Sequence, residues 1–276
     1  MSQDKLIHSA LGVNLVRKLA GEGDRIFTMA RARELAPAVG LSEGYLRQAL
    51  HYLAKAGWVV RLRNGLYALS PSVPGIAPVH EFEVAMALVE PAAVSHWSAL
   101  HYHGLTEQAP RRVFVLTTTE AAVPRSKKTG SRMLGYSVGD MVYQFIQVKP
   151  ERFFGTEKVW LNEARVTVTD PERTLLDGLS MPGYCGDIAE VFHAFKVRGG
   201  DLDIDRIIGY ALRLDAATVK RLGWVLEKQG IKKNRLKLLK DLPIKGYRLL
   251  DPTGPGRGPC NTQWMIQENL PGKVKP

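Results

Sequence analysis

The fold of the N-terminal part of the chain is decided by residues 26–69, IFTMARARELAPAVGLSEGYLRQALHYLAKAGWVVRLRNGLYAL. A helical run from Ala30 to Val39 is followed by a break at Gly40 and by a second helix that Ser42 can N-cap. One face of the second helix is apolar at i, i+3, i+4 and i+7 and is predicted to pack on the first helix; it holds Leu46, Ala49, Leu50 and Leu53. The outer face is polar, basic and partly aromatic; it holds Glu43, Gly44, Arg47, Gln48, His51, Tyr52 and Lys55. The pattern predicts helix, tight turn, helix.

A β-hairpin is predicted directly after this second helix. Residues 58–63 alternate with period two up to Asn64-Gly65, the pair preferred in a type I′ turn. A two-residue loop pairs apolar residues on one face, namely Leu62 with Tyr67 and Val60 with Leu69. Arg61 and Arg63 then point the other way, so the hairpin has a basic edge.

A helix-turn-helix followed by such a hairpin is typical of a winged helix, whose second helix enters the major groove while the hairpin lies along the DNA backbone. Binding to double-stranded DNA is therefore the predicted function of this part. The predicted contact residues are Ser42, Gly44, Tyr45, Arg47, Gln48, His51, Lys55, Arg61, Arg63 and Asn64. Two other interpretations fit the same pattern: a small helical domain whose hairpin only covers the core, and a winged helix that docks a protein.

Length and charge bound the remaining possibilities. The 276 residues, 45% of them hydrophobic, allow one large domain or two ordinary ones. A net charge of +11 and a pI near 9.7 favour a polyanionic partner. The basic excess extends over residues 1–72, 111–160 and 196–250. Either the later segments also contact nucleic acid or an acidic protein, or they carry ordinary solvated charges.

The two cysteines and the N-terminus indicate the compartment. Cys185 and Cys260 lie far apart without zinc-ligand spacing, so free thiols in a reducing compartment are expected. The N-terminus, MSQDKLIHSALGV, lacks a secretion signal, and no run approaches the roughly 18 apolar residues of a membrane span. We therefore expect a cytoplasmic protein with no membrane partner. No cofactor and no metal site are predicted.

The flanking sequence predicts two domains. Residues 3–19 form an amphipathic helix whose core face holds Leu6, Ala10, Leu11, Leu15 and Leu19. Residues 70–78 contain three prolines and a glycine, which preclude a regular element and predict a linker. The predicted domains are a winged helix-turn-helix at 1–71 and an α+β domain at 79–276.

The second domain is predicted to begin with helices at 79–89 and 94–103 and with strands at 113–116, 136–138, 142–148, 158–161 and 166–168. Short connections favour an antiparallel or mixed sheet. A basic loop at 123–132 is either a contact to nucleic acid or a partner, or a solvated connection. Asp170 is predicted to N-cap a helix, further helices follow at 187–197, 205–214 and 216–229, and 247–251 is a candidate strand of the same sheet. The predicted fold class is α+β with a helical end.

Two later segments carry a resemblance to a known family. They read VSHWSALHYHGLT at 94–106 and VTDPERTLLD at 168–177. Together with the predicted winged helix they resemble the AbiEi-type antitoxins of bacterial abortive-infection systems. The resemblance extends from about Thr28 to Phe195 and is loose from about Leu202 onward.

The resemblance implies a DNA-binding transcriptional autorepressor and antitoxin of a type IV toxin–antitoxin system. Such a protein recognises inverted repeats in its own promoter, which favours dimerisation or cooperative binding on the DNA. It neutralises a cognate nucleotidyltransferase-like toxin through its C-terminal domain, and this antagonism need not involve stable toxin binding.

The alternative is an enzyme, a nuclease or nucleotidyltransferase, targeted to DNA by the winged helix. His96, His101 and His103 do not share one helical face, so they do not predict a metal site. The acidic run at 201–205 lacks the preceding glycine-serine turn of nucleotidyltransferases, and its aspartates are expected to be helix caps. Arg173 is expected to pair with a carboxylate and fix its helix against the sheet. No complete catalytic set is found, so the enzyme is the second hypothesis.

Overall fold

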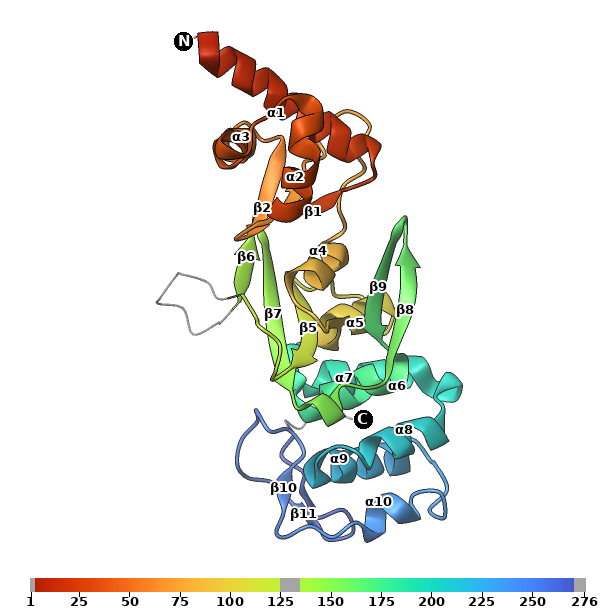
Figure 1. Cartoon of the computed structure of the whole chain (residues 1–276). Helices are drawn as coiled ribbons and strands as arrows, with labels where there is room; N and C mark the ends of the chain where they lie inside the picture. Colours follow the sequence, from red (N-terminus) through yellow and green to blue (C-terminus); the bar gives the residue numbers. More distant parts are fainter. Residues whose placement is uncertain (1–2, 125–134, 271–276) are drawn as a thin grey trace. The chain divides into compact units, whose positions relative to one another are not determined.

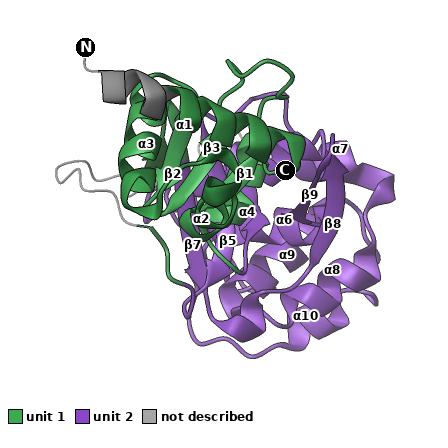
Figure 2. Ribbon diagram, turned by 45° about the horizontal axis from the view of Figure 1, so that its top comes forward, with its two compact units in different colours: residues 1–90, 122–142 green, residues 91–121, 143–276 purple. Residues whose placement is uncertain are grey.

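The computed structural model describes residues 3–124 and 135–270, with side chains from residue 10 onward. Two compact units are present, each α+β in character (Figure 2). Unit 1 comprises residues 1–90 and 122–142, and unit 2 comprises 91–121 and 143–276. The units therefore do not separate at the predicted linker at 70–78, because unit 1 continues past it and takes in a segment from the middle of the chain.

The N-terminal part of unit 1 combines the helices α1, α2 and α3 with a small sheet (Figure 1). Its N-terminal elements are α1 (Gln3–Gly21), β1 (Ile26–Thr28), α2 (Met29–Leu35), α3 (Glu43–Lys55), β2 (Val59–Arg63) and β3 (Leu66–Leu69). The strand order is β1-β3-β2, with both neighbouring pairs antiparallel. The predicted helix over 30–39 is an α-helix only to Leu35 and continues as a 3-10 helix over Ala36–Val39. Gly40, at φ 74°, then turns the chain in the left-handed region that favours glycine.

The two helix starts differ in how they are capped. The Thr28 side chain accepts a hydrogen bond from the backbone N–H of Arg31 and so caps α2. Ser42 occupies the N-cap position of α3, as predicted, but its side chain accepts no capping bond. The predicted position of Ser42 is therefore right, but the predicted capping by its side chain is wrong.

The core of unit 1 follows the predicted apolar face of α3. Leu46, Ala49, Leu50 and Leu53 are all buried, in one cluster with Leu15 and Leu19 of α1. Ala10, predicted on the core face of α1, is exposed, and Val16 is fully buried there. Leu6 lies outside the residues whose side chains are described.

The β2–β3 hairpin differs from its prediction by one residue. Arg63 pairs with Leu66, but Arg61 pairs with Tyr67 and Val60 with Ala68, so the register shifts between Arg61 and Arg63. Leu62 is the extra residue of a β-bulge. The turn is not type I′, because that type needs positive φ at both central residues and only Gly65 of the Asn64-Gly65 pair has it. The register shift at Leu62 also makes the predicted pairs wrong, which were Leu62 with Tyr67 and Val60 with Leu69.

The proline-rich segment contains no helix or strand, as predicted, yet it packs as part of unit 1. Val73 is 3% exposed and belongs to the core cluster around α1 and α3, with Ile76 against it. The next helix, α4 (Glu81–Leu88), also lies in unit 1. Its Glu83 pairs with Arg25 at 2.6 Å, and both side chains are largely buried.

Unit 2 holds most of a six-stranded mixed sheet, as the short connections predict. The strands are β4 (Ala93–Val94), β5 (Arg112–Thr118), β6 (Tyr136–Val138), β7 (Met141–Val148), β8 (Thr156–Leu161) and β9 (Ala164–Thr169), in the order β6-β7-β5-β4-β9-β8. β4 runs antiparallel to β5 and parallel to β9. The predicted helix over 94–103 is shorter, because residues 93–94 are a strand; it is α5 (His96–Tyr102). Of the predicted basic loop at 123–132, residues 125–132 lie outside the described residues.

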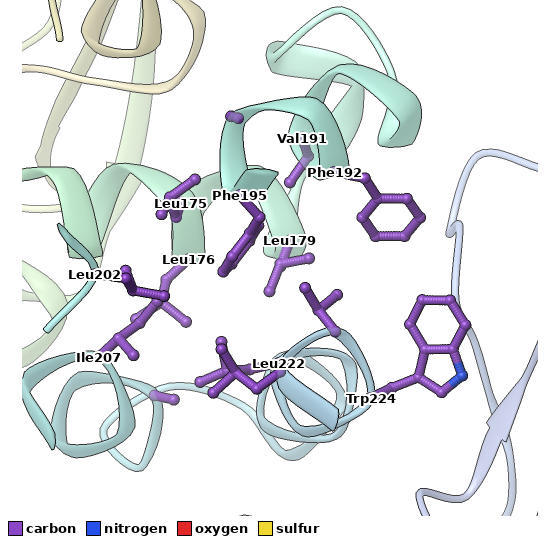
Figure 3. Close-up of a cluster of buried hydrophobic side chains, with 14 of the residues drawn as sticks. Leu175, Leu176, Leu179, Val191, Phe192, Phe195, Leu202, Ile207, Leu222 and Trp224 are labelled. Carbon is purple, nitrogen blue, oxygen red and sulfur yellow. The ribbon is translucent and has the colours of Figure 1, made fainter. Parts of the chain in front are cut away.

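The C-terminal part of unit 2 is mainly helical, as predicted. Its helices are α6 (Pro171–Ser180), α7 (Ile188–Arg198), α8 (Ile204–Ala211), α9 (Ala216–Lys228) and α10 (Lys237–Asp241). Figure 3 shows apolar side chains of α6, α7, α8 and α9 meeting in one cluster, among them Leu176, Phe195 and Leu222. Strand β10 (Arg248–Leu249) does not return to the large sheet; it forms a separate sheet with β12 (Ile266–Gln267) and β11 (Cys260–Asn261).

Two further sequence expectations bear on the compartment. Cys185 is buried, Cys260 is exposed, and both are free thiols as predicted. Within the described ranges, none of the helices combines the length and the apolar character needed to cross a membrane.

Gly223 in unit 2 packs closely against a buried aromatic ring. A Cβ atom on Gly223 of α9 would lie 2.0 Å from the ring of Trp264, which is 1% exposed and donates its indole N–H to Glu227 at 2.8 Å. We expect Gly223→Ala to lower the free energy of unfolding by about 1–3 kcal/mol, because the buried ring has to move. Urea unfolding of the full chain measures this. Gly209→Ala in α8, where a Cβ meets nothing within 4 Å, is the control and should be neutral or stabilising. Equal stability of the two variants would contradict the packing argument.

Candidate functional site

The outer face of α3 and the hairpin β2–β3 together form the candidate site, all within unit 1. The apolar face of α3 is buried against α1 and α2, which forces its polar face outward. All ten predicted contact residues are exposed: Ser42, Gly44, Tyr45, Arg47, Gln48, His51, Lys55, Arg61, Arg63 and Asn64. Surface exposure is the first requirement for a binding role, and each of them meets it.

A hollow of about 490 Å³ lies between α3 and the hairpin. Arg47 and His51 line it from α3, while Arg61 and Asn64 line it from the hairpin. Nη2 of Arg61 donates a hydrogen bond to Oδ1 of Asn64 at 3.0 Å, so the turn holds the arginine. The structure thus brings four of the ten predicted residues to one concave surface.

The other six predicted residues lie outside this hollow. Gly44 lines a second hollow of about 250 Å³ on the α2 side, which also has Arg47 in its wall. Nε2 of Gln48 donates to the hydroxyl of Tyr52 at 3.3 Å, which ties Gln48 along its own helix. Arg47 is therefore the α3 side chain shared by both hollows.

The charges on this face are not compensated by acidic neighbours. Arg47, Lys55, Arg61 and Arg63 form no ion pair with any residue that the structure describes. Other cations of unit 1 do pair: Lys18 with Glu22, Arg25 with Glu83, Arg31 with Asp24 and Glu34, and Arg33 with Glu43. Positive charge therefore remains available on α3 and the hairpin, where a polyanion would meet it.

Sequence analysis missed two residues at this site, Met29 and Arg33. Met29 lines both hollows. Arg33 of α2 lines the smaller one and binds Glu43 at 2.6 Å, so it neutralises the one carboxylate on the outer face of α3. Both residues reach the site because α2 packs beside α3, and the sequence carries no local signal for this contact between helices.

The histidines of unit 2 do not gather into a site. His96 is fully buried at φ 50°, and Oγ of Ser95 lies 2.9 Å from its Nδ1. Burial lowers the pKa of His96 to about 4, so the ring is neutral at pH 7. Nε2 of His103 bonds instead to the backbone oxygen of Thr169 at 2.7 Å. In the described part of the chain, no three His, Cys, Asp or Glu side chains are grouped closely enough to hold a metal ion.

Of the three aspartates at 201–205, all predicted to be helix caps, only Asp203 is one. The prediction is wrong for Asp201, which lies in the 3-10 helix Gly199–Asp201, and for Asp205, which lies in the first turn of α8. Asp203 caps α8, and Asp205 pairs with Arg235 at 2.7 Å. Asp170 caps α6 by accepting from the backbone N–H of Arg173. The predicted pairing of Arg173 is also confirmed, because its Nε lies 2.8 Å from Oδ1 of Asp177.

Comparisons with known proteins give a fold relationship. No protein-family model and no curated protein matches the chain. Among solved structures it is similar to the crystal structure of the RV2827C protein from Mycobacterium tuberculosis, with a TM-score of 0.66 and 14% sequence identity. The match covers 93% of this chain and 90% of that one. At this identity the likeness shows that the two chains share an α+β fold.

Proposed function

We propose that α1–α3 and the β2–β3 hairpin form a winged helix that binds double-stranded DNA. In this proposal α3 enters the major groove, which is wide enough for a helix, and the hairpin lies along the backbone. The observation that carries it is that Arg47, Lys55, Arg61 and Arg63 are all exposed and form no ion pair with a described residue, while Arg47 and Arg61 line the same hollow. The hollow of about 490 Å³ supports it further, since Arg47 and His51 of α3 and Arg61 and Asn64 of the hairpin line it together.

We propose further that the chain is a transcriptional autorepressor and antitoxin of a type IV toxin–antitoxin system. Support comes from the resemblance of residues 94–106 and 168–177 to AbiEi-type antitoxins. On this proposal the winged helix binds inverted repeats in the chain's own promoter, as a dimer or cooperatively. Unit 2 neutralises a nucleotidyltransferase-like toxin, with or without stable contact to it.

The DNA part of the proposal is tested with the hairpin arginines. The full chain should bind a duplex from upstream of its own gene more tightly than a shuffled duplex of equal length. Replacing both Arg61 and Arg63 with Ala should weaken binding to both duplexes, because phosphate contacts carry no sequence information. The slope of log affinity against log salt should flatten by about two units at most.

A matched control for this measurement is Lys18→Ala on α1. The ammonium of Lys18 already pairs with Glu22 at 2.8 Å, so this variant should leave the salt slope unchanged. An unchanged slope in the arginine double variant would remove the hairpin from the DNA. No preference of the wild-type chain for the upstream duplex would argue against autorepression.

The antitoxin part is tested by co-expression with a neighbouring nucleotidyltransferase-like gene from an unrelated promoter. The full chain and the Arg61→Ala, Arg63→Ala double variant should both restore growth, because DNA binding is not needed once the promoter is replaced. If growth stays arrested when the toxin is co-expressed with the full chain and also with the double variant, the antitoxin role is refuted.

A further inference from the structure

The hairpin contains a bulge between the two arginines proposed to contact phosphate. Leu62 has no partner in the β3 register, while Arg61 pairs with Tyr67 and Arg63 with Leu66. The Leu62 side chain is 2% exposed, whereas Arg61 and Arg63 are both exposed. Because a bulge bends a strand and redirects the side chains beside it, its geometry sets where Arg61 and Arg63 point.

A hydrogen bond from a distant segment meets the backbone at this bulge. The Tyr136 hydroxyl donates to the carbonyl oxygen of Leu62 at 2.7 Å. Tyr136 is the first residue of β6 and lies 74 positions along the chain, yet both residues belong to unit 1. A bulge interrupts the strand ladder, so its backbone groups need partners from elsewhere, and Tyr136 supplies one.

We propose that Tyr136 is a positioning residue for DNA binding: its hydroxyl holds the bulge at Leu62 and thereby aims Arg61 and Arg63 at the phosphate backbone. The proposal rests on the DNA-binding function proposed above. Arg61 is then held from two sides, through the bulge by Tyr136 and through its guanidinium by Asn64. A residue beyond the proline-rich segment therefore helps to set the geometry of the hairpin.

Tyr136→Phe is the direct test, because it removes the hydroxyl and keeps the ring. In the DNA-free full chain, amide hydrogen exchange over residues 59–69 should become about 2- to 10-fold faster, the size expected for losing one hydrogen bond. Exchange in α1 and in unit 2 should not change. Affinity for both the upstream and the shuffled duplex should fall by a similar factor, because the misdirected arginines contact phosphate.

The matched control is Tyr210→Phe, which also removes one tyrosine hydroxyl, the donor to Asp170 at 2.9 Å in unit 2. It should leave both the hairpin exchange and the DNA affinity as in the wild type. Thermal unfolding of the two variants separates a local effect from a general loss of stability.

The outcomes distinguish this inference from the proposed function. Hairpin exchange in Tyr136→Phe equal to that of the wild type, or exchange raised evenly over the whole of unit 1, would overturn the positioning role. Faster hairpin exchange with unchanged DNA affinity would overturn it as well, provided that the wild-type chain binds DNA. Absence of DNA binding by the wild type would instead refute the proposed function on which the inference depends.

Discussion

Replacing Asp177 with Leu is expected to lower the free energy of unfolding by about 3–5 kcal/mol, because it leaves the guanidinium of Arg173 buried without its counter-charge. Arg173 is 1% exposed and Asp177 3% exposed. Besides Asp177, Arg173 donates to the carbonyl oxygens of Arg152 at 2.8 Å and Phe154 at 3.3 Å. The arginine therefore joins α6 to the segment before β8, and its guanidinium would stay buried without a carboxylate in the variant. Urea unfolding of the full chain gives the value.

The double variant Arg173→Met, Asp177→Leu should recover much of this loss, since a buried pair replaced by apolar groups is often neutral. Oδ2 of Asp177 already lacks a hydrogen-bond partner among the described residues, so the pair is costly to bury even when intact. As a control, Asp205→Ala breaks the exposed pair with Arg235 and should cost less than about 1 kcal/mol. If Asp177→Leu costs no more than Asp205→Ala, the buried pair is not what holds α6.

Arg47→Ala is expected to reduce affinity for the upstream duplex by roughly 1–3 kcal/mol more than affinity for a shuffled duplex, the amount that one bidentate base contact contributes. Arg47 is the α3 side chain that lines both hollows, and no described carboxylate pairs with it. Such a side chain is free to reach a base edge in the major groove. Titrations of both duplexes at one salt concentration measure the difference.

The comparison that isolates base contacts is the double variant Arg61→Ala, Arg63→Ala, which should weaken binding to both duplexes equally. Gln48→Ala should have a smaller effect than Arg47→Ala, because Gln48 is bonded to Tyr52 and lies outside the hollows. Equal losses of Arg47→Ala on the two duplexes would place Arg47 on phosphate and not on a base.

Local signals of the sequence determined most of the elements and the exposed site residues. β-branched and aromatic residues located β5, β7 and β9, because such side chains fit the pleated surface of a strand. Burial alternates only over the first residues of β9, whereas β5 is buried at every residue from Val113 to Thr118. The period of α3 decided which side of that helix is buried, and therefore that Arg47 and His51 are exposed. Asp170-Pro171 located the start of α6, because capping chemistry involves only neighbouring residues.

Features that depend on distant contacts were decided only by the tertiary structure. The bulge at Leu62 is bonded to Tyr136, so the Asn64-Gly65 pair alone predicted the wrong register. The proline-rich segment excludes helix and strand by its composition, but whether it links or packs depends on Val73 reaching the core of unit 1. Arg33 enters the site through Glu43 of another helix. Each of these contacts joins different elements of the fold, and periodicity, capping and turn propensities describe only neighbouring residues within one element.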